Sequence, residues 1–375
     1  MNAPLNFAQG NEVRASYLIF PRWTQPFWTW LTGRALPGDA PWIVLNHWEY
    51  LGVILTIFIG SAALEVFAIH RHWWPLLPFA WIAAVGSTRA LVSTIVHQCI
   101  HNKFAPEPGK WLAQIVAEAL TILTLTRSAR LYRRDHVRLH HNPGVFTTER
   151  DPSAQFLLEC GFSPGRTVAG SWKRLLVNAV SPAFHARFLL SRLAGNFVQV
   201  SVPRRLAALI YWCAGLFTAL RLVKAEHLAV LFILGYLIPV VFCYQVSVLF
   251  EFVSEHAWLS RAGELNHKSW GRFCGSRVPT LTGKVTIDTW AWIKWLVAMM
   301  TVHLIARIAI LPADLPQHDF HHRFPGTDEW TTAAYARTRW ASEGRFGDCF
   351  EFWGLHNVLN HVFATLEQSD PSSLG

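Results

Sequence analysis

Charged side chains are scarce in this sequence. Asp, Glu, Lys and Arg make up only 15% of the 375 residues, whereas hydrophobic residues make up 52%. Because soluble domains contain about 25% charged residues, this composition excludes an ordinary soluble protein. The 19 tryptophans point the same way, since the amphipathic indole ring favours the boundary between lipid and water. We therefore expect an integral membrane protein.

Cysteine is also scarce, and several familiar site signatures are missing. The six cysteines form no C-x-x-C pair, which argues against a zinc ribbon, an iron–sulfur cluster and a disulfide framework. Gln98 follows His97, so the H-E-x-x-H signature of zinc proteases is absent. The net charge of +9 comes without a basic arm or nucleic-acid motif. We expect no nucleic-acid partner and attribute the charge to loops that face an anionic leaflet.

Long apolar runs occur at four places. Residues 1–40 contain no apolar core segment, so we expect no cleavable signal peptide and a first span that acts as its own signal. The runs long enough to cross a bilayer are residues 51–69, 75–96, 206–223 and 227–250. Arg89 interrupts the second run, and we expect it at the interface or inside the helix bundle.

Two further apolar segments are not expected to cross. Residues 111–126 are too short for a crossing, and the Trp-rich segment 288–311 is typical of a helix on the membrane surface. The four remaining runs then form two hairpins, each of which returns the chain to the side that it left. Basic residues are concentrated on that shared side, especially in segment 127–205, which marks it as cytoplasmic.

The expected fold is all-α and integral to the membrane, with four transmembrane helices in two hairpins and a cytoplasmic helical cap rich in histidine. We expect one domain that spans residues 1–375. Its expected parts, in chain order, are an N-terminal segment 1–45, a first hairpin 46–96, a cytoplasmic part 97–205, a second hairpin 206–250 and a cytoplasmic part 251–375.

Histidines gather in three clusters. The first is the pair His97 and His101, four residues apart and therefore on one face of a helix. The other two clusters are His136 with His140 and His141, and His318 with His321 and His322. Together they hold eight of the 18 histidines in so few residues that chance would place about one there. His256, directly after Glu255 and just beyond the fourth run, is a ninth candidate.

Nine clustered imidazoles indicate a centre of two metal ions. Neutral imidazole is the commonest metal-binding side chain, and a single structural zinc takes only about four ligands. Imidazole suits iron, zinc and copper, but only a redox metal gives a membrane-embedded centre an obvious task, so iron fits best. The alternative from another class is a membrane metal carrier or a haem electron-transfer protein, although haem takes only two axial ligands.

The three clusters, in this order and spacing around two membrane hairpins, resemble the integral-membrane fatty acid desaturase and hydroxylase superfamily. The resemblance covers roughly residues 45–330. His97 through Asn102 is similar to the first histidine box of that superfamily, and the segment from His318 to Pro325 is most like the third box of acyl-CoA desaturases.

The resemblance implies an O2-dependent oxidoreductase with a non-haem diiron centre held by these nine histidines. It further implies a fatty acid, fatty acyl thioester or lipid as substrate, and electrons from an external donor of the ferredoxin, rubredoxin or cytochrome b5 type with its reductase. No fused cytochrome b5 domain is recognisable, so the donor is expected to be a separate protein. Desaturation is the expected reaction. Hydroxylation and oxidative decarboxylation to a 1-alkene are the alternatives.

Two features depart from the desaturase pattern. Phe252 occupies the Asn position of the desaturase N-x-x-x-H form, and Glu255-His256 looks closer to the Glu-His pair of alkane hydroxylases. The second cluster has three residues before its His pair, where many desaturases have two. Among the polar neighbours, Asn102, Asp135, Glu255 and Asp319 are candidates to orient the imidazoles by hydrogen bonding. His356 and His361 lie beyond the region of resemblance and are not counted as ligands.

Overall fold

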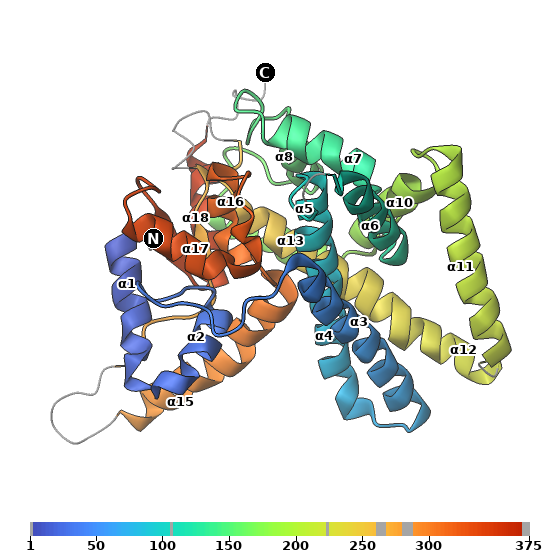
Figure 1. Cartoon of the computed structure of the whole chain (residues 1–375), viewed down its shortest axis with the longest axis horizontal. Helices are drawn as coiled ribbons and strands as arrows, with labels where there is room; N and C mark the ends of the chain where they lie inside the picture. Colours follow the sequence, from blue (N-terminus) through green and yellow to red (C-terminus); the bar gives the residue numbers. More distant parts are fainter. Residues whose placement is uncertain (1–2, 106–107, 223–224, 260–267, 280–287, 370–375) are drawn as a thin grey trace.

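The computed structural model describes residues 3–105, 108–222, 225–259, 268–279 and 288–369. These residues form helices almost throughout, with one small sheet, which confirms the all-α prediction. Figure 1 shows the long helices α3 (His47–His70), α4 (Leu77–Ala90) and α11 (Val202–Leu222) on one side of the molecule. The N-terminal helices α1 (Phe7–Ala15) and α2 (Gln25–Thr32) lie on the other side.

Four helical stretches among the described residues are long and apolar enough to cross a membrane. They are His47–His70, Trp74–Ile100, His227–Glu255 and Thr289–Ile310. Trp74–Ile100 consists of η3 (Trp74–Leu76), α4, η4 (Leu91–Val96) and α5 (His97–Ile100), and His227–Glu255 consists of most of α12 (Ala225–Phe232), η6 (Ile233–Cys243) and α13 (Tyr244–Glu255). The number agrees with the prediction, and the first three stretches coincide with predicted runs.

The fourth stretch differs from the prediction. It is Thr289–Ile310, which the sequence assigns to the membrane surface, and it contains α15 (Thr289–Ala298), η7 (Met299–His303) and η8 (Ala306–Ile310). The predicted span 206–223 lies in α11, which is not among the four candidates. The physical reason is charge, because Arg204 and Arg205 near the start of α11 and Arg221 near its end shorten the apolar stretch between them.

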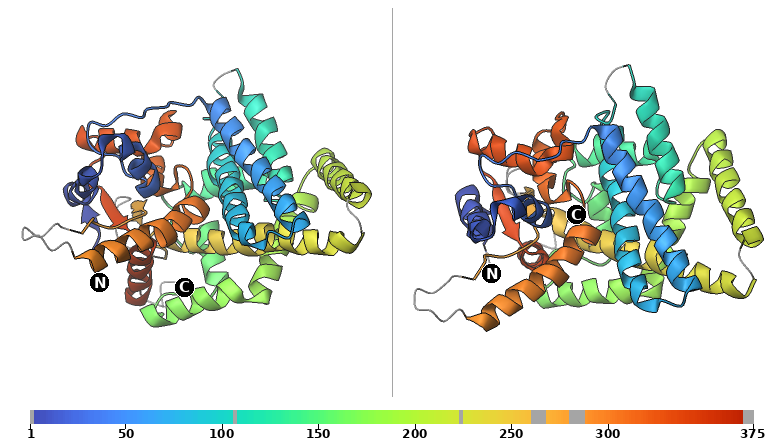
Figure 2. Two further views of the ribbon diagram at one scale, coloured as in Figure 1. Left: turned by 90° about the horizontal axis from the view of Figure 1, so that it is seen from below. Right: turned by 60° about the horizontal axis from the view of Figure 1, so that its bottom comes forward.

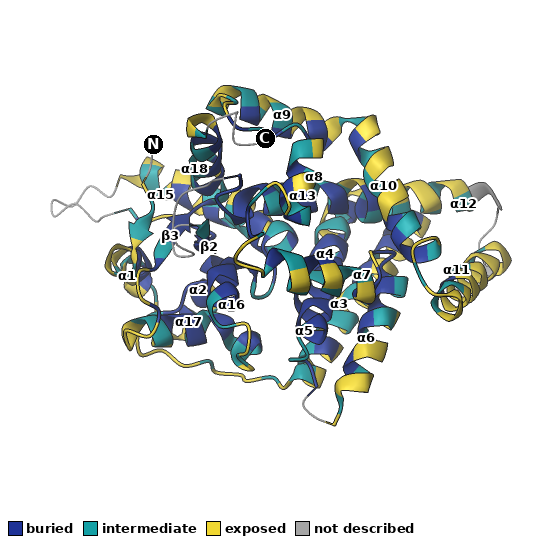
Figure 3. Cartoon of the chain, turned by 90° about the horizontal axis from the view of Figure 1, so that it is seen from above, coloured by how far each residue is buried: buried dark blue, intermediate teal, exposed yellow. Residues whose placement is uncertain are grey.

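The helix built from α4, η4 and α5 is the most enclosed of the candidate spans. Of the 18 most apolar consecutive residues of this helix, 67% are buried, whereas the corresponding fraction is 22% in His47–His70 and in His227–Glu255. The less enclosed helices leave large apolar side chains uncovered, among them Ile59 and Val66 of α3. In Figure 3 the central helices are largely dark blue, whereas α11 is yellow along much of its length. Uncovered apolar faces of this kind are suited to contact with lipid.

The α3–α4 hairpin begins at a strong helix cap. Asn46 accepts hydrogen bonds from the backbone N–H groups of Trp48 and Glu49, at 2.9 and 3.0 Å, and the side chain of Glu49 accepts one from the N–H of Asn46 at 2.8 Å. This reciprocal capping box explains why the first span starts at His47. The hairpin then packs against η6 (Figure 2).

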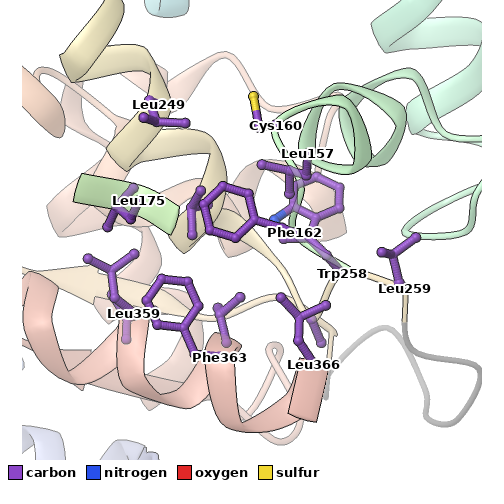
Figure 4. Packing of buried hydrophobic residues seen from close by; sticks show 14 of the residues in the cluster. Leu157, Cys160, Phe162, Leu175, Leu249, Trp258, Leu259, Leu359, Phe363 and Leu366 are labelled. Atoms are coloured by element: carbon purple, nitrogen blue, oxygen red, sulfur yellow. The ribbon is translucent and has the colours of Figure 1, made fainter. Parts of the chain in front are cut away.

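Helices between and after the spans build the cap around the histidine clusters. Their bounds are α6 (Lys110–Leu123), α7 (Ala129–Arg133), η5 (Arg134–His140), α8 (Pro152–Glu159), α9 (Val168–Val180), α10 (Pro182–Phe197), η9 (Leu315–Gln317), α16 (His318–Arg323), η10 (Glu329–Thr332), α17 (Ala333–Ser342) and α18 (Leu355–Gln368), with η1 (Ser16–Ile19) and η2 (Arg22–Thr24) near the N-terminus. The largest hydrophobic core joins α8, α9, α13 and α18. Figure 4 shows Leu359, Phe363 and Leu366 of α18 facing Leu175 of α9 and Leu157 of α8.

A three-stranded sheet joins segments that are far apart in the sequence. β3 (Phe350–Trp353) lies between β1 (Leu5–Asn6), with which it is antiparallel, and β2 (Gly271–Phe273), with which it is parallel. Glu351 is paired in register with Leu5 on one side and with Gly271 on the other. The N-terminal segment is thereby held against the part of the chain that carries the third histidine cluster.

A buried network of charges supports α16. Arg337 donates to Asp319 (Nη2 to Oδ2, 2.8 Å) and to Glu351 (Nη1 to Oε1, 2.8 Å), and Arg34 donates to the same oxygen of Glu351 at 2.9 Å. All four side chains are fully buried. Because Asp319 lies between His318 and Phe320, the network ties the third histidine cluster to α17, β3 and the segment after α2.

Removing one partner from this network should be costly. In an Arg337→Met variant, Asp319 loses its arginine partner and Glu351 loses one of two, while both carboxylates stay buried. The free energy of unfolding should therefore fall by about 3–5 kcal/mol. Thermal unfolding of the detergent-solubilised protein measures the effect. Arg339→Met is the matched control, because Arg339 pairs with Glu329 on the surface and its loss should cost less than about 1 kcal/mol. Equal losses in the two variants would contradict the supporting role of the network.

Candidate metal centre

The structure brings all nine predicted histidines together in two groups. The first group consists of His97, His101, His136, His141 and His321, and the second of His140, His256, His318 and His322. Within each group, one ring nitrogen from every member lies within 4.8 Å of those of the other members. The groups adjoin each other, because the rings of His141 and His322 are stacked with their centroids 4.4 Å apart.

The distances between ring nitrogens fit metal coordination. The Nε2 atoms of His97 and His136 are 2.8 Å apart, those of His136 and His141 are 3.0 Å apart, and those of His318 and His322 are 2.9 Å apart. Two nitrogen ligands at a right angle, each about 2.1 Å from one ion, would be separated by roughly 3 Å.

Two buried nitrogens in the groups lack hydrogen-bond partners. The Nε2 atoms of His101 and His256 have none in the part of the chain that the structure describes. A buried polar atom without a partner is costly, and one metal ion in each group would satisfy the nitrogen there. The donor set present therefore fits two metal ions.

The π-helix η5 decides how the second histidine cluster is divided. The backbone N–H of His141 donates to the carbonyl of His136 at 3.0 Å, an i to i+5 bond that is wider than the α-helical one. A helical segment would place His136 and His140, four residues apart, on one face with His141 beside them, and the rings of His136 and His140 are indeed stacked with their centroids 5.0 Å apart. In the wider turn, His141 instead joins His136 in the first group and His140 belongs to the second. The π-helical turn thus divides histidines that lie side by side between the two groups.

The other ligand candidates lie at helix ends or on one short helix. On α16, His318 and His322 are four residues apart and enter the second group together, while His321 enters the first. α13 ends at Glu255, and His256 adopts an extended backbone. The Nδ1 atom of His256 lies 3.2 Å from the backbone oxygen of Lys268, which leaves Nε2 directed to the second group.

Burial keeps most of these imidazoles neutral. It lowers the pKa of His136, His321 and His322 well below the usual range, and neighbouring imidazoles lower it further. Burial likewise lowers the pKa of His101 to about 4 and that of His141 to about 2. Because the neutral form is the one that binds metal, the environment favours ligation.

Asp151 orients His140, and it is not among the residues that the sequence predicts for the site. Its Oδ2 accepts a hydrogen bond from Nδ1 of His140 at 2.8 Å and another from the backbone N–H of Thr147 at 2.9 Å. Burial lowers the pKa of His140, but the hydrogen bond to Asp151 and its charge outweigh burial, so the pKa of His140 is raised. A carboxylate on the far nitrogen of a histidine fixes the ring for a metal on the other nitrogen.

The sequence signal for Asp151 is that of a helix start. Its Oδ1 accepts from the N–H of Ser153 at 2.9 Å and caps α8, whose first residue is Pro152. An Asp-Pro pair therefore predicts the beginning of a helix, without any indication that the same carboxylate reaches a histidine eleven residues earlier.

Of the four predicted orienting residues, only Glu255 contacts a histidine. Its Oε1 lies 2.7 Å from Nε2 of His318 and 4.0 Å from Nε2 of His256. Asn102 accepts from Arg133, Asp135 pairs with Arg127 and Arg134, and Asp319 binds Arg337. His356 stacks on Trp172, and His361 packs against Trp270 and Phe352, so neither belongs to the two groups.

A sequence model of a protein family described as "Fatty acid desaturase" matches residues 71–305. The match covers more than half of the chain and includes the first two histidine clusters and His256. The chain belongs to the fatty acid desaturase family. Comparisons with curated proteins and with solved structures gave no match.

Membership in the fatty acid desaturase family, together with the four candidate spans, makes this an integral membrane protein. The matched range is narrower than the resemblance predicted over residues 45–330. The third cluster, from His318 to His322, lies beyond the end of the match, so its likeness to acyl-CoA desaturases stays a prediction.

For a protein of the desaturase family, the space next to the histidines is the place to expect an acyl chain. A cavity of about 310 Å³ adjoins both groups, with His97, His136 and His318 in its wall. Apolar side chains such as Phe156 and Phe188 line another part of the wall. A largely apolar cavity with a few polar groups is the usual form of a small-molecule site.

The role of Asp151 can be tested by removing only its charge. In Asp151→Asn the side chain can still cap α8, because Asn is as good an N-cap as Asp, but it holds the imidazole of His140 more weakly. The affinity for Fe²⁺ should fall roughly 10–100-fold, measured by competition with a chelator. Asp135→Asn, which removes a carboxylate paired with two arginines, should bind Fe²⁺ like the unchanged protein. Unaltered Fe²⁺ affinity in Asp151→Asn would refute the orienting role.

Proposed function

We propose that the protein is a membrane-bound non-haem diiron enzyme that uses O2 to oxidise an aliphatic C–H bond of a fatty acyl chain. The observation that carries this proposal is the convergence of nine buried or half-buried histidines in adjoining groups of five and four, three of which line a largely apolar cavity. The family supplies the class of substrate. We propose that the nine histidines are the ligands and that desaturation is the reaction.

Two iron ions, one in each group, would supply the redox chemistry that activates O2. The protein itself keeps most of the imidazoles neutral by burial, orients His140 through Asp151, and seats the chain in a cavity that excludes water. In the overall balance a CH2–CH2 unit loses two hydrogen atoms. One O2 takes up these hydrogens with two protons and two electrons from the donor, and two water molecules form.

The electron donor and the reaction product each need an experiment of their own. We propose a separate donor of the ferredoxin, rubredoxin or cytochrome b5 type. Gas chromatography of lipids and headspace from an expressing host distinguishes the alternatives, because desaturation, hydroxylation and oxidative decarboxylation yield an internal alkene, an alcohol and a 1-alkene.

Ligand variants test the diiron proposal. His97→Ala in the first group and His256→Gln in the second should each lower bound iron and reduce turnover by more than about 100-fold. Loss of a residue that only hydrogen-bonds to a ligand costs up to about 100-fold, and loss of the ligand itself should cost more. Iron is measured by elemental analysis and turnover by product yield. His356→Ala is the control, because His356 stacks on Trp172 outside both groups. Full iron content and activity in the two ligand variants would refute the assignment.

The convergence of the histidines also bears on the topology. Trp74–Ile100 ends in the first cluster and His227–Glu255 ends beside His256, so both helices approach the site from the same side of the membrane. The chain must then cross the membrane an odd number of times between His141 and His227. α11 is the long apolar helix in that interval, and it runs nearly parallel to α3 in the right-hand view of Figure 2. We propose that α11 crosses the membrane despite the arginines at its ends.

The same reasoning applies to Thr289–Ile310. Residues 257–317 start and end beside the histidine groups, so an even number of crossings must lie between them. The interval contains one candidate span among its described residues, Thr289–Ile310. We propose that this helix lies along the membrane surface, and that the histidine groups face the cytoplasm.

Cysteine labelling tests the crossing of α11. In a background with Cys213→Ser and Cys243→Ser, which removes the two native thiols that are not buried, Val198→Cys and Arg221→Cys each place one accessible thiol near an end of α11. A membrane-impermeant maleimide should label Val198→Cys from the cytoplasmic side and Arg221→Cys from the opposite side. Arg166→Cys serves as a control and should behave like Val198→Cys. Labelling of both α11 positions from one side would mean that α11 does not cross.

A further inference from the structure

Arg89 is a buried cation in the wall of the cavity. It lies within the Trp74–Ile100 span, and its side chain is only 2% exposed. Among the described residues it has one ion pair, which joins Nη2 to Oε2 of Glu251 at 3.2 Å, longer than the about 2.7–2.9 Å that is usual for charge-assisted hydrogen bonds. Its Nε has no hydrogen-bond partner among the described residues.

Glu251 is already neutralised by another arginine. Arg272 donates from Nη2 to Oε1 of Glu251 at 2.9 Å and from Nη1 to the backbone oxygen of the same residue at 3.0 Å. Two buried arginines therefore share one carboxylate. Arg89 therefore has no carboxylate of its own beside the cavity, an arrangement that is costly inside a membrane protein unless further negative charge is supplied.

A second cation in the cavity wall adds to this positive charge. Arg192 donates to the backbone oxygens of Thr124, Leu125 and Val240, at 2.9, 2.8 and 2.7 Å. No carboxylate pairs with it among the described residues, and its guanidinium lies 4.8 Å from the ring centroid of Tyr244. The backbone oxygens satisfy its donors but do not cancel its charge.

The carboxylates that line the cavity are engaged or exposed. Glu255 lies against His318, Asp135 pairs with Arg127 and Arg134, and Glu159 is exposed. None of them offers a charge partner to Arg89. The interior of the cavity thus has a place for one added anion.

The position of Arg89 shows how far the expected anion site lies from the metal centre. Glu251, its partner, precedes Glu255 by four residues on α13, which is about 6 Å along the helix axis. Glu255 in turn lies 2.7 Å from His318 of the second group. The guanidinium of Arg89 is thereby about one helical turn from the histidines.

We propose that Arg89 binds the carboxylate of the substrate inside the cavity, so that the substrate is a free fatty acid bound with its head group inward. The proposal rests on the proposed function and names its substrate class. A thioester carries a bulky carrier group instead of a carboxylate, and its head group would stay at the exposed part of the cavity wall, here called the mouth, to which Arg187 belongs. With the carboxylate so near the histidines, the oxidised carbons are those close to the carboxyl end.

Equilibrium binding to the full-length protein in lipid nanodiscs tests the proposal. A radiolabelled saturated fatty acid is displaced by the unlabelled acid or by the primary alcohol of equal chain length. The unchanged protein should bind the acid roughly tenfold or more tightly than the alcohol, the preference expected for a hydrogen bond to a charged group. Arg89→Gln should abolish this preference while alcohol binding is kept, and Arg89→Lys should retain part of it. Arg187→Gln, the same change at the mouth, should retain all of it.

The outcomes separate this proposal from the proposed function. Equal affinity for acid and alcohol, or loss of the preference in Arg187→Gln instead of Arg89→Gln, would overturn the inward carboxylate and leave an acyl-chain site intact. Failure of both ligands to bind would count against the proposed function itself. Alcohol binding verifies that each variant is folded. Product analysis adds an independent readout, since oxidation in the middle of the chain would also overturn the proposal.

Discussion

The close packing of nine buried or half-buried imidazoles in two adjoining groups is the constraint on which the rest of the structure depends. The groups draw on α5, η5, α16 and the residue after α13, segments that are far apart in the sequence. Imidazoles that are buried so closely lose hydration and are held neutral, which is unfavourable unless their nitrogens find partners. Two metal ions would supply those partners, so the fold and the metal centre depend on each other.

The surroundings of the groups show how such a site is kept rigid. Asp151 caps α8 and holds His140 with the same carboxylate, so one residue couples a helix start to a ligand. On the opposite side, Arg337 binds Asp319 between two histidines of α16 and links this short helix to β3 through Glu351. Both arrangements use charge-assisted hydrogen bonds in buried places, where water cannot compete for them.

Arginine has two different roles inside this molecule. Arg34 and Arg337 are matched by Glu351 and Asp319, and their charges serve to join elements. Arg89 and Arg192 lie in the wall of the cavity without a full complement of negative charge. The contrast between matched and unmatched buried cations distinguishes structural charges from a charge available to a ligand, and it would not be visible from counts of arginine alone.

The sequence by itself determined the class of protein and the identity of the clustered histidines. Low charge and long apolar runs require a membrane because they are properties of local composition, and the clustering of histidines is local as well. All nine histidines named from the sequence lie in the two groups. The family match confirms the superfamily, although it ends before the third cluster.

Only the tertiary structure decided how these residues are arranged. The division into five and four depends on the π-helical turn of η5, which the spacing of His136 and His140 does not reveal. The role of Asp151 depends on a contact across eleven residues, and the incomplete charge compensation of Arg89 depends on Arg272 being present on the same carboxylate. The topology that we propose for α11 and for Thr289–Ile310 likewise rests on where their neighbours meet and not on hydropathy. These features arise from contacts between distant segments, which a local pattern of residues does not encode.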